Sequence, residues 1–186
     1  MTTAPKVCDN AAVYMLIQQP SDGRWLTFDR VKPPWGVAGP AGHIDEHGDP
    51  VDAMYAETEE EVGLKVTDYQ LLVFDSWRDN TCRRLPGPEG VGHKSYLYEV
   101  EVTGTPRPAA EETAKLRWRT NTELQALANR TVDYAHGRIS NADFKASLGM
   151  EPVWVEWFRV AGAITVTPEE AAVVDRLAAT RYWEEA

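Results

Sequence analysis

Three glutamates in one short segment are the residues of this chain best suited to chemistry. The segment AETEEEVGL, residues 56–64, is typical of a helix end, because Gly63 can adopt the left-handed conformation that closes a helix. Glu57, Glu60 and Glu61 share one face of that helix, although carboxylates repel each other there and oppose the helix dipole. A divalent cation would remove this cost, and carboxylate oxygens suit Mg²⁺ or Mn²⁺. A solvated acidic face is the alternative interpretation.

The helix that carries these glutamates is predicted over residues 51–63. Asp49 is a natural N-cap and Pro50 fits the first helical position. A stripe of residues at helical spacing is expected to face the core, namely Val51, Met54, Tyr55, Thr58 and Val62.

The elements around this helix are read from alternation, turn residues and caps. The chain is expected to begin with a loose arm over residues 1–9, and the Gly- and Pro-rich residues 32–50 to form a long loop with one short strand. Strands are expected over residues 11–19, 24–30, 68–77, 94–104 and 116–120, a hairpin loop over 83–93, and helices over 121–137, 151–162 and 167–185. This order predicts a mixed α/β or α+β fold.

Length and composition limit the possible domain organisation, ligands and location of the protein. With 186 residues, the chain suits a single domain over residues 1–186, with a core over about 8–127 and a helical C-terminal extension over about 128–186. The net charge of −10 argues against a nucleic-acid binder. The apolar runs are too short to span a bilayer. We expect a cytoplasmic protein whose two cysteines, Cys8 and Cys82, are buried or incidental thiols.

Two further patterns have competing interpretations. The string HIDEH, residues 43–47, matches a metalloprotease motif, but that motif needs a helix and this string lies between glycines, so we do not expect a zinc protease site. Trp154 and Trp157, at i,i+3, are expected in a helix core, although they could instead stack on a nucleotide base.

The segment GHIDEHGDPVDAMYAETEEEVGL, residues 42–64, resembles the Nudix box. That motif reads Gly, five residues, Glu, seven residues, Arg-Glu, an aliphatic, any residue, Glu-Glu, any residue, Gly and an aliphatic. Six positions agree in register: Gly42, Glu57, Glu60, Glu61, Gly63 and Leu64. The flanking residues 35–45 and 116–127 also resemble the family.

The resemblance implies a Nudix-type α/β/α sandwich with a mixed sheet, and a hydrolase that cleaves the pyrophosphate of a nucleoside diphosphate derivative with Mg²⁺ or Mn²⁺. The family pattern makes Glu57, Glu60 and Glu61 metal ligands, one of which, or a loop carboxylate, would act as the general base. The backbone carbonyl of Ala41 and the side chain of Glu112 are further candidate ligands, and Arg30 is a candidate substrate contact. Modified nucleoside triphosphates, ADP-ribose-like compounds and nucleotide sugars are candidate substrates, and a homodimer is an option because many members dimerise.

Three positions depart from the family pattern, and one of them is Thr58, which replaces an aliphatic residue. Gly48 replaces the loop glutamate and Ala56 replaces the helix arginine, a pair that in the family helps to hold the site. Asp49 or Glu46 could supply the loop acid instead. The alternative function is therefore a weakly active or inactive Nudix-fold protein that binds or senses nucleotides.

Overall fold

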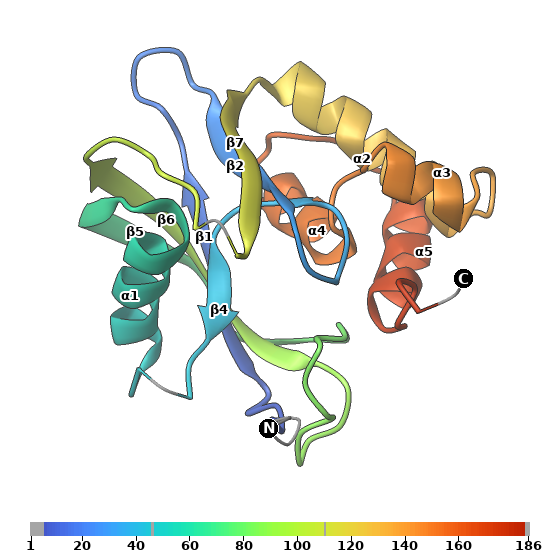
Figure 1. Cartoon of the computed structure of the whole chain (residues 1–186), viewed down its shortest axis with the longest axis horizontal. Coiled ribbons are helices and arrows are strands. Elements are labelled where there is room, and N and C mark those ends of the chain that lie inside the picture. The colour runs from blue at the N-terminus through green and yellow to red at the C-terminus, as the bar shows by residue number, and fades with distance from the viewer. Residues whose placement is uncertain (1–5, 46, 110, 185–186) are drawn as a thin grey trace.

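The computed structural model describes residues 6–45, 47–109 and 111–184. Its elements follow each other as strands, one helix, more strands and then four helices (Figure 1). They are β1 (Ala11–Ile17), β2 (Trp25–Arg30), β3 (Val37–Ala38), β4 (Ala41–His43), α1 (Pro50–Val62), β5 (Lys65–Arg78), β6 (His93–Thr103), β7 (Thr113–Arg119), α2 (Asn121–Ala135), α3 (Asn141–Ala146), α4 (Pro152–Val160) and α5 (Pro168–Ala178).

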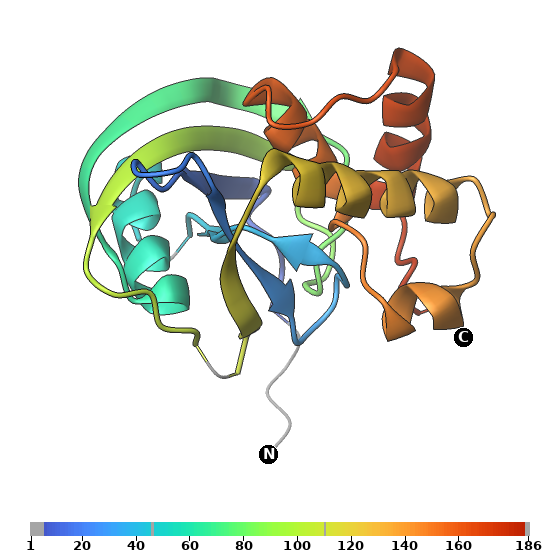
Figure 2. The ribbon, with the colours of Figure 1, turned by 90° about the horizontal axis from the view of Figure 1, so that it is seen from above.

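The strands form two sheets. The larger has the order β4-β1-β6-β5 and the smaller the order β3-β2-β7. Strand β1 runs parallel to β6 and antiparallel to β4, so the larger sheet is mixed, as predicted. The long strands β5 and β6 are strongly curved (Figure 2), and their pairing shifts register at three places. Each shift is a bulge-like irregularity of the kind that bends and twists a strand.

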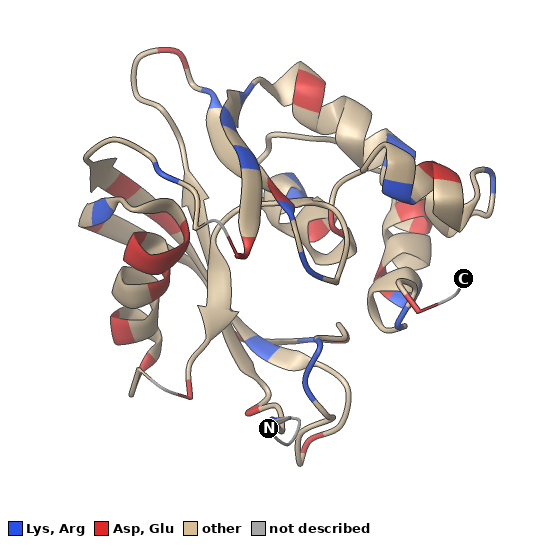
Figure 3. Cartoon of the chain, in the orientation of Figure 1, with Lys and Arg blue, Asp and Glu red and all other residues tan. Residues whose placement is uncertain are grey.

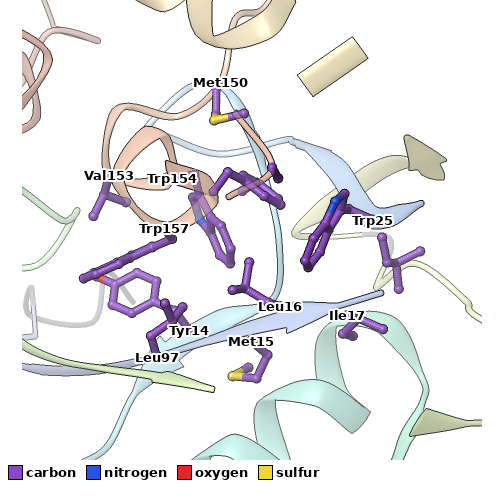
Figure 4. Packing of buried hydrophobic residues seen from close by; sticks show 14 of the residues in the cluster. Tyr14, Met15, Leu16, Ile17, Trp25, Leu97, Met150, Val153, Trp154 and Trp157 are labelled. Carbon is purple, nitrogen blue, oxygen red and sulfur yellow. The ribbon is translucent and has the colours of Figure 1, made fainter. Parts of the chain in front are cut away.

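Strand β1 is the centre of the core because both of its faces are covered. Met15 and Ile17 lie on the side of α1, whereas Tyr14 and Leu16 lie on the side of Trp154 (Figure 4). A strand buried on both faces reads as a continuous apolar run, which β1 does. The predicted α/β/α sandwich with a helical C-terminal extension is confirmed.

The tryptophans of α4 belong to this core. Trp154 and Trp157 are fully buried, and the Tyr14 ring lies 5.8 Å and 5.0 Å from their centroids. The prediction that they are core residues is confirmed. None of the described helices is long and apolar enough to cross a bilayer.

Several predicted boundaries were wrong. Strands β5 and β7 begin earlier than expected, two short strands replace the single one expected in residues 32–50, and α3 is a separate helix. Helix α5 ends at Ala178 rather than near residue 185. Beyond it, Tyr182 turns inward, is 2 % exposed, and packs against Phe144. Burial of this ring stabilises the fold more than another exposed helical turn would.

Two predictions of exposure were also wrong. The expected arm over residues 1–9 is ordered in its described part, since Val7 bridges to Leu85 and Cys8 is buried. Residues 1–5 lie outside the described part of the chain. On α1, Tyr55 is 41 % exposed rather than buried, because it lies over β5, an edge strand of the larger sheet, where it packs edge-on against the exposed Tyr69.

Candidate active-site cleft

Helix α1 has the predicted caps at both ends. The Asp49 carboxylate accepts hydrogen bonds from the backbone N–H groups of Val51 and Asp52, at 2.8 and 2.9 Å. Gly63 closes the helix in the left-handed conformation with φ 67°. These caps fix where the helix begins and ends, and therefore the direction of each glutamate side chain.

The three glutamates of the acidic face differ in exposure. Glu61 is buried, Glu57 is half-buried and Glu60 is exposed, so the face runs from the core outward to solvent. Glu59 is exposed and lies outside the cleft described below. The structure therefore places the three predicted carboxylates on one face, with exposure to solvent increasing from Glu61 to Glu57 to Glu60.

Glu61 is anchored to strand β4. Its Oε2 accepts a hydrogen bond from the backbone N–H of Ala41 at 2.8 Å. Burial raises the pKa of this carboxyl well above its usual range; Arg30 opposes that effect, whereas Glu57 adds to it. A buried carboxylate beside another carboxylate is the environment in which a cation offsets the cost of ionisation.

Glu57 lies between the helix and the preceding loop. Its Oε1 is 3.5 Å from the Nε2 of His47. Its side chain also passes closely over Gly42, where a Cβ would lie 1.8 Å from Oε1. The conformation of Glu57 therefore depends on the absence of a side chain at position 42 and on the loop that carries His47.

All six residues predicted for the site line one cleft, whose volume is about 250 Å³. Strand β2 supplies Arg30, β4 supplies Ala41, and the residue before β7 supplies Glu112. The remaining three are the glutamates of α1. Glu112 lies exposed at the rim, with its Oε1 3.8 Å from Lys32 Nζ, so its burial and contacts are those of a surface carboxylate.

The side of the cleft opposite α1 is basic. Arg30, Lys32, Arg83 and Arg84 all line it. Figure 3 shows acidic residues gathered on α1 and basic residues on β2, β7 and the loop between β5 and β6. Lys94, on β6, pairs with Glu89 at 3.0 Å and does not line the cleft. A cleft with carboxylates on one wall and cations on the other suits a polyanion that binds together with metal ions.

The sequence did not point to Glu151 as part of this region. Its Oε2 lies 3.3 Å from Nη1 of Arg30, and the side chain is buried at the start of α4. Arg30 is therefore held from behind by the C-terminal extension. In the sequence, a glutamate before Pro152 indicates only the start of a helix. Nothing in the sequence pairs it with Arg30.

The loop acid of the family pattern has no direct replacement among the described residues of this loop. Asp49 is occupied as the N-cap of α1, and Glu46 lies outside the described residues. Gly48 has φ +95°, a conformation that disfavours a glutamate. The string HIDEH forms no helix: His43 ends β4 and His47 lies in a turn.

Comparison with known proteins agrees with this architecture. A family profile for the NUDIX domain matches residues 9–138. No curated protein sequence matches the chain.

Among solved structures, a Deinococcus radiodurans protein has a TM-score of 0.55 at 15% identity, with 86% of this chain and 88% of that chain covered. A MutT protein from Methanosarcina mazei has a TM-score of 0.50 at 12% identity, with 67% and 85% covered. A MutT hydrolase from Burkholderia pseudomallei is 25% identical, with a TM-score of 0.46 and 64% and 86% covered.

Proposed function

Because the chain belongs to the Nudix hydrolase family, whose members act on pyrophosphate bonds, we propose that it hydrolyses a nucleoside diphosphate derivative or a modified nucleoside triphosphate with the help of Mg²⁺ or Mn²⁺. One observation carries the proposal: Glu57, Glu60 and Glu61 line a single cleft whose opposite wall is basic. Such a cleft can hold cations on one side and phosphates on the other.

The residues of the cleft fit a hard divalent cation. The donors available are carboxylates at positions 57, 60 and 61 and the backbone carbonyl of Ala41, and oxygen donors are what Mg²⁺ and Mn²⁺ prefer. Glu112 at the rim is a further donor. When bound, the cations would neutralise charge on the phosphates and lower the pKa of water.

The remaining steps fall to side chains of this chain. Arg30, Lys32, Arg83 and Arg84 would bind the phosphate oxygens and orient the scissile bond across the cleft. A glutamate of the acidic face, or a nearby loop carboxylate, would accept a proton from the attacking water. The phosphates would thus lie between the basic wall and the cations held by the glutamates, so that phosphate and glutamate charges do not repel each other directly.

The nucleotide itself would be selected outside the acidic face. The loop between β5 and β6 supplies Arg83 and Arg84, and the C-terminal extension supplies Glu151 behind Arg30. Modified nucleoside triphosphates, ADP-ribose-like compounds and nucleotide sugars all carry the required pyrophosphate. We further propose that the extension and the family-matched region act as one domain, since α4 packs in the same core cluster as β1.

A nucleotide-binding or sensor protein with little activity is the second candidate. Gly48 and Ala56 favour it, because the pair that normally fixes the glutamates is missing. The contact between His47 and Glu57 favours the enzyme, since it supports the same glutamate from the same loop. Dimerisation remains a prediction.

The test is a phosphate-release screen over the three substrate classes with Mg²⁺ and with Mn²⁺. We expect turnover by the wild-type protein, a loss of at least about 100-fold in Glu60→Gln and Glu61→Gln, and wild-type turnover in Glu59→Gln, which lies outside the cleft. Equal turnover by all four proteins would refute the assignment. Nucleotide binding without turnover would instead support the sensor.

A further inference from the structure

Four side chains of the kinds that bind metals, outside the glutamate face, converge at one end of the larger sheet. Cys8 precedes β1, His43 ends β4, Cys82 lies in the loop between β5 and β6, and His93 begins β6. Because β1 runs parallel to β6 and antiparallel to β4, the first residues of β1 and β6 lie beside the last residues of β4, at one end of the sheet. Sheet register therefore assembles residues that are far apart in the sequence.

The distances among the four donor atoms suit one ion. The Sγ of Cys8 is 3.2 Å from Nε2 of His93 and 3.5 Å from Nε2 of His43. All four donor atoms lie within 4.8 Å of one another. A tetrahedral zinc ion separates two sulfur and two nitrogen ligands by about 3.3 to 3.8 Å. The two distances from the Cys8 sulfur to the histidine nitrogens lie in or just below that range without any movement of the chain.

The surroundings also orient the donors. The Nδ1 of His93 lies in close contact with Oδ1 of Asn80, whose Nδ2 in turn donates to the hydroxyl of Tyr14. An amide oxygen at Nδ1 favours the tautomer that leaves Nε2 free to bind a metal, as outer partners of metal-bound histidines do. The backbone N–H of Asn10 points at the Cys8 sulfur at 3.3 Å, which stabilises a thiolate.

We propose that Cys8, His43, Cys82 and His93 form a tetrahedral Zn²⁺ site that fixes the loop between β5 and β6 against the sheet. The donor set decides the metal, because two sulfurs and two imidazole nitrogens select zinc over Mg²⁺, which prefers oxygen. The site is closed, with four protein ligands, as structural zinc sites are. It is therefore distinct in chemistry from the glutamate face.

A metal here would add to contacts that already hold this loop against the sheet. Asn10, two residues after Cys8, donates from its amide to the carbonyls of Gly90 and Gly92. Cys82 is followed directly by Arg83 and Arg84, which line the cleft. A metal at this position would tie the start of β1, the end of β4 and both ends of the loop together. It would thus place the two arginines, acting as a positioning element rather than a catalytic one.

From the sequence, Cys8 and Cys82 were interpreted as buried or incidental thiols, and His43 belonged to a string rejected as a protease motif. The separations of 35 residues between Cys8 and His43, and 85 between Cys8 and His93, explain the failure. Metal motifs are recognised when ligands are close in the chain, and here only strand pairing unites them.

Metal analysis of the protein purified without chelator is the first test. We expect one zinc per chain, and Co²⁺ exchanged into the protein should show the strong visible absorption of a tetrahedral cobalt–thiolate site. Cys82→Ala and His93→Ala should lose the metal, whereas His136→Gln, an exposed histidine elsewhere, should keep it. Cys82 is only half-buried, so its variant tests the site even if His93→Ala fails to fold.

Absence of zinc together with absence of a cobalt–thiolate spectrum would overturn the proposal. So would a Cys8–Cys82 disulfide in the purified protein, detected by thiol titration after denaturation without reductant, or zinc retained by Cys82→Ala. The Glu60→Gln variant should keep its zinc, so that failure of the hydrolase assignment and failure of the zinc site are separate results.

Discussion

The side chain of Glu57 occupies the space in which a Cβ on Gly42 would lie. A methyl group there would come 1.8 Å from Oε1 and 1.9 Å from Cδ of that glutamate. Among the thirteen glycines of the chain, this one is needed for space at the cleft rather than for a left-handed backbone. The first glycine of the Nudix box thus sets the conformation of one of its glutamates.

Gly42→Ala should therefore lower turnover by about 100-fold, because the carboxylate of Glu57 must move by about 1 Å or more. The free energy of unfolding should fall by about 1 kcal/mol through overpacking. Steady-state kinetics and urea unfolding measure the two effects.

The double variant Gly42→Ala/Glu57→Ala supplies the control for this clash. It should be as stable as Glu57→Ala alone, since the side chain that collides is gone, yet it should not regain activity. If Gly42→Ala turned over substrate at the wild-type rate, Glu57 would not be held by Gly42 in the way its geometry indicates.

Replacing Glu61 should have opposite effects on stability and on metal binding. Its pKa is raised by burial, so its contribution to folding is favourable at low pH and is lost as pH rises through the raised value. In EDTA near neutral pH, Glu61→Gln should be more stable than wild type by about 1 kcal/mol or more.

Addition of Mg²⁺ should reverse that order. The wild-type protein gains stability by binding the ion, whereas Glu61→Gln should gain less. Thermal melts in EDTA and in Mg²⁺ across neutral pH measure both effects, with Glu59→Gln as the exposed control. A Glu61→Gln protein that is less stable than wild type in EDTA would contradict the assigned cost of ionising this buried carboxyl.

Restoring the family residue at position 48 should damage this protein. Gly48 has φ +95°, which side chains rarely adopt, so Gly48→Glu should cost about 1 to 3 kcal/mol of stability. Ala56→Arg should be tolerated better, because Ala56 is a half-buried helical position with ordinary backbone. Chemical denaturation of the two single variants distinguishes them; equal stability would show that the loop readily rearranges.

The sequence predicted what depends on local rules and missed what depends on pairing across the sheets. Caps and a 3.6-residue period were enough to place Glu57, Glu60 and Glu61 on one face of α1. Tyr55 was misplaced because exposure at a helix margin depends on how far the sheet beneath extends, and Tyr69 of β5 lies beside it.

The Cys/His cluster and the contact of Glu151 with Arg30 could not be predicted from the sequence. Both depend on strand register or on how the C-terminal helices pack back onto β2, which short-range patterns do not encode. Gly48 was read as a loss relative to the family, whereas its backbone conformation gives a local reason for glycine.

Glu151 should matter to the cleft although it lies outside the family-matched residues. It is buried, and its only described ionic partner is Arg30, which is itself partly exposed in the cleft. Glu151 is the carboxylate that interacts most strongly with Arg30, so its removal leaves the arginine only the weaker interactions with Glu61 and Glu112. Glu151→Gln should therefore lower stability by about 2 kcal/mol, less than for a fully buried pair because Arg30 reaches solvent.

The same change should raise KM more than it lowers kcat, because Arg30 would lose its support while the glutamates of α1 stay in place. Urea unfolding and steady-state kinetics of Glu151→Gln, with Glu169→Gln in the exposed first turn of α5 as control, measure both effects. A Glu151→Gln protein with wild-type KM would show that Arg30 holds its position without the extension, and that its contact with Glu151 serves stability alone.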